Sequence, residues 1–141
     1  SSYGIFVGLT DQVASLEMPI TIQDGIAQFT STADDAVGFF WNPGATASVV
    51  TWAYGGVKAT AETAAAFMTS ALPVKNTAET LRIDISSAGA ATFYRNGTLI
   101  ATVADAVTAT VPLTPTVVIR NRSGAVAQTL DVDFIRVTQT R

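Results

Sequence analysis

The feature that most constrains this chain is a run of short alternating segments between residues 79 and 103. In residues 81–85 apolar side chains alternate with charged ones, which is the period-two pattern of a half-buried strand. A second strand is predicted over 91–95, and the Asn-Gly dipeptide at 96–97 suits a two-residue type I′ turn into a third strand, 98–103. The stretch therefore predicts a three-stranded antiparallel meander.

Similar short apolar or alternating segments recur along the rest of the chain. Strands are predicted over residues 3–9, 36–41, 48–54, 116–121 and 127–137, the last two forming a hairpin. Many short strands separated by turn residues are typical of a sandwich or barrel. The 141 residues also match the usual size of one domain. We expect an all-β, two-sheet antiparallel β-sandwich that occupies residues 1–141 as a single domain.

Two segments are less regular. The Gly-Gly dipeptide at 55–56 predicts a turn, after which the polar residues 57–60 would return as the second arm of an outer hairpin. Residues 61–70 suit either a strand or a short helix, and a lone helix of that length would be marginal. Both alternatives stay open for this segment.

Composition argues against several classes of function. The chain has no cysteine and no histidine, so it cannot build a thiol or histidine nucleophile system or a site for transition metals based on those residues. A net charge of -3 argues against a nucleic-acid partner, which needs clustered lysine and arginine. No apolar run approaches the roughly 18 residues of a membrane-spanning helix, so no membrane partner is expected.

Acidic residues are the remaining candidates for chemistry. Asp131 and Asp133 lie two apart on a predicted strand, which places them on one face about 7 Å apart, within the range that glycosidases use. Alternation with apolar residues puts that face toward solvent, so we interpret the pair as solvated. Asp34 and Asp35 could offer oxygens to calcium, but adjacent acidic residues in a loop are usually solvated as well. We therefore expect no catalytic residue, no metal site and no cofactor.

Several stretches of the sequence together resemble one family. They are ETLRIDISSAGAATFYRNGTLIATV at 79–103, PLTPTVVIRNR at 112–122, TLDVDFIRV at 129–137, GIFVGLTD at 4–11 and AVGFFW at 36–41. The order of these stretches resembles the concanavalin A-like lectin/glucanase (jelly-roll) domains of tailed-phage virion proteins. The resemblance covers most of the chain, and its motifs are specific to a fold rather than to an activity.

The resemblance implies a location and partners. It suggests a non-catalytic structural or decoration (cement) protein of the virion, exposed on the extracellular particle and binding capsid or tail proteins through its surface and edge strands. The Glu-x-Asp-x-x-Glu pattern of the family's glucanases is absent, since no third carboxylate extends the pair at 131 and 133. Low charge and exposed edges also suggest a homo-oligomer.

The chain departs from the family at its start. The family has at least one strand ahead of the segment that begins near Tyr3, and only two serines precede that residue here. A processing site, a shortened variant, or a strand supplied by a neighbouring chain would each account for the difference. The last possibility matters because an unfilled position in a sheet leaves backbone groups that another chain can satisfy.

The contact residues for assembly are predicted in the irregular segments, 10–24 and 104–112. In the first of these Leu16, Met18, Ile20 and Ile22 alternate with other residues and have no obvious core partner. We take these four as the candidate assembly contacts. They equally suit an ordinary edge strand of the sandwich, and that alternative stays open.

The alternative function is a carbohydrate-binding module that attaches a phage fibre or secreted protein to host glycans. Sugar binding by sandwiches uses exposed aromatic rings. Tyr54 and Tyr94 lie near predicted turns and are the candidate glycan contacts, whereas Trp41 and Trp52 are expected in the core. Tyr residues converging on a concave face would favour sugar, and a flat apolar patch or an unpaired strand edge would favour assembly.

Overall fold

The computed structural model describes residues 2–14, 17–23, 28–44, 51–69, 72–74, 76–123, 127 and 129–139. The elements within these residues are all β-strands. They are β1 (Ser2–Thr10), β2 (Ile20–Ile22), β3 (Phe29–Ser31), β4 (Ala36–Trp41), β5 (Ala53–Lys58), β6 (Ala61–Phe67), β7 (Leu81–Ile85), β8 (Ala91–Arg95), β9 (Thr98–Val103) and β10 (Thr114–Ser123).

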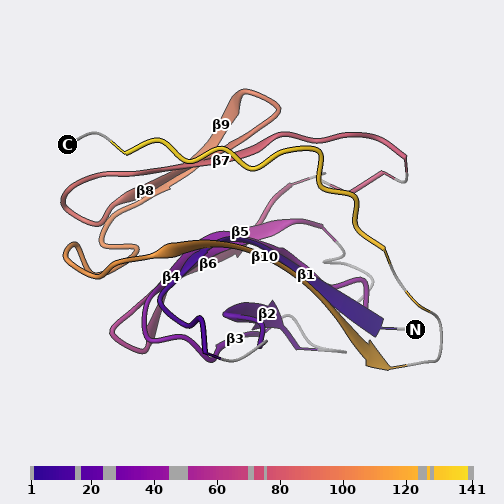
Figure 1. Ribbon diagram of the computed structural model, residues 1–141, viewed down its shortest axis with the longest axis horizontal. Coiled ribbons are helices and arrows are strands. Elements are labelled where there is room, and N and C mark those ends of the chain that lie inside the picture. Colours follow the sequence, from indigo (N-terminus) through magenta and orange to yellow (C-terminus); the bar gives the residue numbers. More distant parts are fainter. Residues whose placement is uncertain are drawn as a thin grey trace.

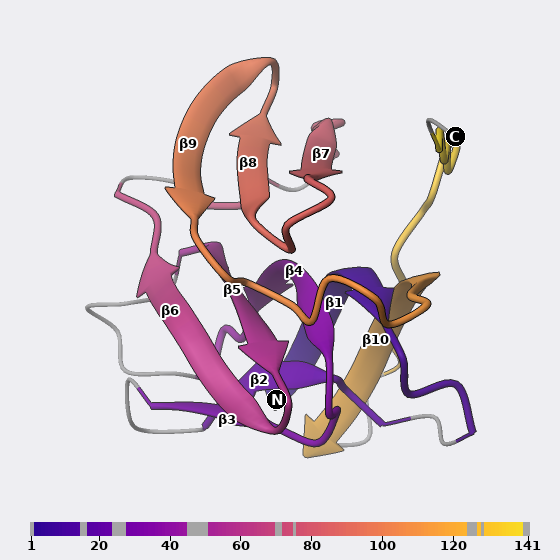
Figure 2. The same ribbon diagram turned by 90° about the vertical axis from the view of Figure 1, so that its left-hand side faces the viewer.

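The strands form three layers, as Figures 1 and 2 show. A five-stranded sheet with the order β10-β1-β4-β5-β6 lies in the middle. The meander β7-β8-β9 covers one face of it and the two-stranded sheet β2-β3 covers the other. Every strand pairing is antiparallel. The predicted all-β, antiparallel sandwich class is confirmed.

β4 of the middle sheet is buried on both faces because each outer layer covers one set of its alternating side chains. Phe6 and Phe40 belong to the core beneath β2-β3, whereas Phe39 belongs to the core beneath the meander. The rings of Phe39 and Phe93 of β8 meet edge to face with centroids 5.3 Å apart. Burial on both faces explains why β4 reads as the continuous apolar run AVGFFW rather than as an alternating one.

Glycines open the space that one of these cores needs. Gly8 of β1 pairs directly with Gly38 of β4. A Cβ atom added at Gly38 would lie 2.5 Å from Cε2 of Phe6, which is closer than real atoms approach. The two glycines therefore make room for the Phe6 ring against the sheet.

Several sequence predictions of strands are confirmed. β4 has the predicted bounds, and β1 extends the predicted strand by one residue at each end. The meander is present with its predicted turn, in which Asn96 and Gly97 have φ of 50° and 79°. These positive values are those of a type I′ turn, the geometry that suits an Asn-Gly hairpin. Residues 61–67 form a strand, which decides between the two alternatives left open there.

The predicted turn at the Gly-Gly dipeptide is wrong. Both glycines lie inside β5, and the chain turns later, at Ala59 and Thr60, with φ of 48° and 71°. The glycines serve close packing instead, since a Cβ atom added at Gly56 would lie 2.3 Å from the carbonyl oxygen of Ala106. Residues 48–50 of the strand predicted over 48–54 lie outside the described residues, and its last two residues begin β5.

The predicted last strand is also wrong. β10 is present, but the described residues beyond it, 127 and 129–139, form no strand ladder. In Figure 1 this yellow segment crosses the molecule in an extended path on the meander's side of the middle sheet. Its alternation of apolar and acidic residues suits a strand, but a strand needs a hydrogen-bonded neighbour, and none of the described strands pairs with it.

Candidate functional site

A groove of about 2360 Å³ lies between the middle sheet, β7 and the residues after β10. We call it the open groove, and we call residues 129–139 the C-terminal segment. Ile5, Val7 and Leu9 of β1 line the groove from the middle sheet. Leu81 and Ile83 of β7 line it from the meander.

The open groove exists because the two facing sheets differ in width. Phe93 of the meander packs on Phe39 of β4 and on Tyr54 of β5, so the three strands of the meander cover that part of the five-stranded sheet. Val7 and Leu9 of β1 remain only partly buried. Figure 2 shows the C-terminal segment, rather than a fourth strand of the meander, above β1 and β10.

β7 forms one edge of the meander. Among the described strands it pairs with β8 alone, so its other side carries unpaired backbone N–H and C=O groups. An edge of this kind is a template for pairing with a further strand. All five residues of β7 border the open groove. Leu81 and Ile83 pack against the core beneath the meander, while the alternate residues, Arg82 and Asp84, bind each other through two hydrogen bonds.

The C-terminal segment exposes a run of large apolar side chains. Leu130 is half-buried and packs against the core beneath the meander. The side chains that follow are exposed: Val132 by 48%, Phe134 by 69%, Ile135 by 59% and Val137 by 61%. Exposed large apolar residues are normal when scattered singly, but four of them within six residues make this segment a candidate interaction site.

The candidate assembly contacts lie elsewhere than predicted. Met18, Ile20 and Ile22 are 2%, 1% and 1% exposed and pack with Phe6 and Phe40 beneath the middle sheet. Leu16 lies outside the described residues. The burial has a simple cause, since β2 pairs with β3 to form a third layer whose inner face rests on the middle sheet. These three side chains are therefore not available to a partner, and residues 20–22 are a strand of the fold.

The two candidate glycan contacts are not brought together. Tyr54 points toward the meander, with its ring centroid 5.2 Å from that of Phe93. Tyr94 alternates with Phe93 along β8 and so lies on the opposite face of the meander, where the guanidinium of Arg82 sits 4.6 Å from its ring centroid. Each ring is half-buried, and the two share no surface.

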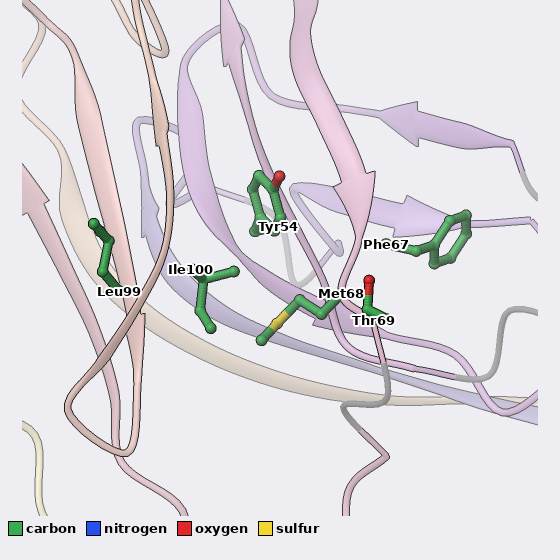
Figure 3. A pocket seen from close by; sticks show the side chains of 6 residues that line it. All are labelled: Tyr54, Phe67, Met68, Thr69, Leu99 and Ile100. Carbon is green, nitrogen blue, oxygen red and sulfur yellow. The ribbon is translucent and has the colours of Figure 1, made fainter.

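Tyr54 lines a small pocket of about 260 Å³ at the other edge of the meander. Its other lining residues are Phe67, Met68, Thr69, Leu99 and Ile100. Figure 3 shows Met68 and Ile100 near Tyr54, with the Phe67 ring pointing away. The lining offers two side-chain hydroxyl groups among apolar groups, which is little for a sugar that presents hydroxyls around its ring.

A largely buried ion pair lies at one end of the open groove. Glu79 and Arg95 form a salt bridge with side chains only 12% and 17% exposed. The indole Nε1 of Trp52 donates a 2.9 Å hydrogen bond to the same Glu79 carboxylate. Sequence reasoning missed this cluster because its three members are separated by 16 and 27 residues, and no periodic pattern links them.

Aromatic rings line the same end. The rings of Tyr3 and Trp41 meet edge to face at 5.3 Å, and Trp41 lies 6.3 Å from Trp52. Burial raises the pKa of the Tyr3 hydroxyl, because the charged form would lose hydration there. As predicted, Trp52 is buried in the core, and Trp41 packs against it.

The acidic residues considered for chemistry are separate. Buried Asp35 accepts hydrogen bonds from the backbone N–H groups of Ala59 and Thr108, so it fixes loops rather than facing a ligand. Asp131 and Asp133 are exposed on the C-terminal segment. Within the part of the chain that the structure describes, acidic side chains do not gather in groups of three that could hold a metal ion. That part also contains no helix of the length and hydropathy needed to cross a membrane.

Comparison with protein-family models, with curated proteins and with solved structures finds no match to this chain. The interpretation of function therefore depends on the residues and the geometry described above.

Proposed function

We propose that this protein is a non-catalytic structural or decoration protein of a tailed-bacteriophage particle. In this role it binds capsid or tail proteins, or further copies of itself, through sheet edges and apolar surface. The sequence resemblance to virion jelly-roll domains suggests the setting. The observation that carries the proposal is the exposed apolar C-terminal segment beside an unpaired strand edge and an apolar groove.

An isolated chain leaves both apolar side chains and the polar backbone groups of a strand edge in water. Val132, Phe134 and Ile135 leave most or about half of their surface in water, and burying a side chain of this kind is worth about 1.5–3 kcal/mol. The free edge of β7 adds main-chain hydrogen bonds to any strand that joins it. A partner that covers both features gains apolar area and backbone pairing together, which is the chemistry of assembly by strand addition.

A carbohydrate-binding role is the second candidate. The pocket beside Tyr54 is the observation that favours it. The open groove favours assembly more strongly, because six aliphatic side chains of β1 and β7 line it, beside the charged pair Arg82 and Asp84.

Co-sedimentation with particles of the phage that encodes the protein tests the proposal. We expect wild-type protein to pellet with the particles and to saturate at a fixed stoichiometry, and Phe134→Lys to pellet less. Ile20 or other core positions are unsuitable for this test because their substitution would unfold the chain. A folded wild-type protein that ignores the particles and binds a glycan array instead would support the second candidate and contradict the first.

A further inference from the structure

β7 and the C-terminal segment carry the same alternating pattern. Residues 81–85 read L-R-I-D-I and residues 130–134 read L-D-V-D-F. Each therefore has one apolar face of three side chains and one charged face of two. In β7 Leu81 and Ile83 of the apolar face pack against the core beneath the meander, and Arg82 and Asp84 of the charged face form an exposed ion pair.

A strand added to the free edge of β7 would continue this division of faces. Leu130, Val132 and Phe134 would point into the open groove, toward Val7 and Leu9 of β1, while the two aspartates faced solvent. Leu130 already packs against the core at this groove. The meander would gain a fourth strand, which would bring it closer to the width of the five-stranded sheet below.

We infer that this fourth strand is the C-terminal segment of a second copy of the chain. The inference rests on the proposed function and names its partner. Within one chain the segment lies at the rim of the groove, yet it forms no ladder with β7 and leaves Phe134 69% exposed. In Figure 1 the segment and β7 also run in the same direction, so pairing within the chain would be parallel, beside a meander that is antiparallel throughout.

A second copy related by a two-fold axis across the strands presents its segment in the opposite direction. Antiparallel pairing with Val132 opposite Ile83 places Asp133 of one copy beside Arg82 of the other, and Phe134 opposite Leu81. Asp84 then lies opposite Asp131, but its carboxylate is already bound by Arg82. The exchange is reciprocal, since each copy both donates a segment and accepts one. Such an arrangement closes at two copies.

Disulfide trapping tests the inference cleanly because the chain contains no cysteine. Ile83→Cys and Val132→Cys single variants are mixed and oxidised, so that only a contact between two copies can link them. We expect a covalent heterodimer on a non-reducing gel. Val132 is opposite Ile83 whether the strands run antiparallel or parallel, so the result does not depend on direction.

A second pair on the exposed face avoids any cost to the core. Arg82→Cys mixed with Asp133→Cys should cross-link, because these positions are opposite in the antiparallel register. Arg82→Cys mixed with Asp131→Cys should not, because those positions are opposite only in the parallel register. Ile83→Cys mixed with Ile135→Cys is the matched negative control, since position 135 lies on the other face of the segment.

The outcomes separate this inference from the proposed function. A double variant, Ile83→Cys with Val132→Cys, that forms an intramolecular disulfide as a monomer would show that the segment closes its own groove and would overturn the inference. The absence of any cross-link in all pairs would overturn it as well. Neither result bears on particle binding, which the co-sedimentation of wild-type protein measures separately.

Discussion

Two segments with the same alternating pattern have opposite environments in this molecule. Met18, Ile20 and Ile22 alternate near the N-terminus and are buried, whereas Val132 and Phe134 alternate near the C-terminus and are exposed. The sequence predicts the second set as core, and the first as assembly contacts or, equally, as an ordinary edge strand. Alternation shows that a segment has two different faces, but only the arrangement of layers decides whether a partner covers the apolar one.

The largest difference in stability between the two segments is expected when a charge is introduced into each. Ile20→Lys places an ammonium group at a position that is 1% exposed, without a partner, so we expect loss of more than about 4 kcal/mol and an unfolded chain. Phe134→Lys adds the same charge to an exposed position and should leave the far-UV circular dichroism and urea midpoint of the monomer unchanged. A cooperatively folded Ile20→Lys protein would mean that β2-β3 is not a covering layer.

Loss of the largely buried ion pair should cost more stability than loss of the exposed one. Glu79→Ala leaves Arg95 largely buried without its partner and removes the acceptor of Trp52, so we expect a loss of about 3–5 kcal/mol in urea unfolding. Asp84→Ala breaks the exposed pair with Arg82 and should cost under about 1 kcal/mol. Equal losses in the two variants would contradict the burial assigned to the groove's end.

Shortening an apolar side chain should produce a smaller difference in stability between the buried and the exposed segment. Ile22→Val removes one methylene from a packed core and should cost about 0.5–1.5 kcal/mol. Val132→Ala should change the stability of the dilute monomer by less than about 0.5 kcal/mol, because the side chain is 48% exposed there. A Val132→Ala loss that matches the Ile22→Val loss at low protein concentration would place the C-terminal segment in the monomer's own core.

The smallest expected effect is electrostatic and belongs to the charged face of β7. Hydrogen bonds from Arg82 hold the pKa of the Asp84 carboxyl below its ordinary value. A depressed pKa contributes stability that is present above the ordinary value and is lost as the pH falls through the lowered one. Carboxyl-carbon NMR should show Asp84 titrating below a usual aspartate, and Arg82→Gln should return it to the usual range. An unchanged midpoint in Arg82→Gln would show that the pair does not hold in solution.

Local patterns predicted the strands whose ends are also marked by local signals. The meander has both the period of a strand and an Asn-Gly turn, and β4 has an apolar run that stops at Asn42 and Pro43. The role of the β5 glycines could not be predicted locally, because Gly56 makes room for Ala106, which is distant in sequence and approaches it only in the folded chain. A glycine signals a turn or a close approach equally well.

The candidate site could not be predicted because it follows from the difference in width between two sheets. No local pattern states that the meander has three strands and the facing sheet has five. The alternation of residues 130–134 predicts a strand with an apolar core face, but these residues form no strand, and no described strand pairs with them, so most of their apolar side chains lie on the surface. The Glu79–Arg95 pair likewise required the fold to bring distant residues together.

The mass of the protein in solution, measured by light scattering over a range of concentrations, tests the central claim most directly. Wild-type protein should be a dimer that dissociates on dilution, Phe134→Lys should be a monomer, and Ile135→Lys, whose side chain is similarly exposed but lies on the opposite face, should remain a dimer. A wild-type protein that stays monomeric at every concentration, or two lysine variants that behave alike, would contradict the account.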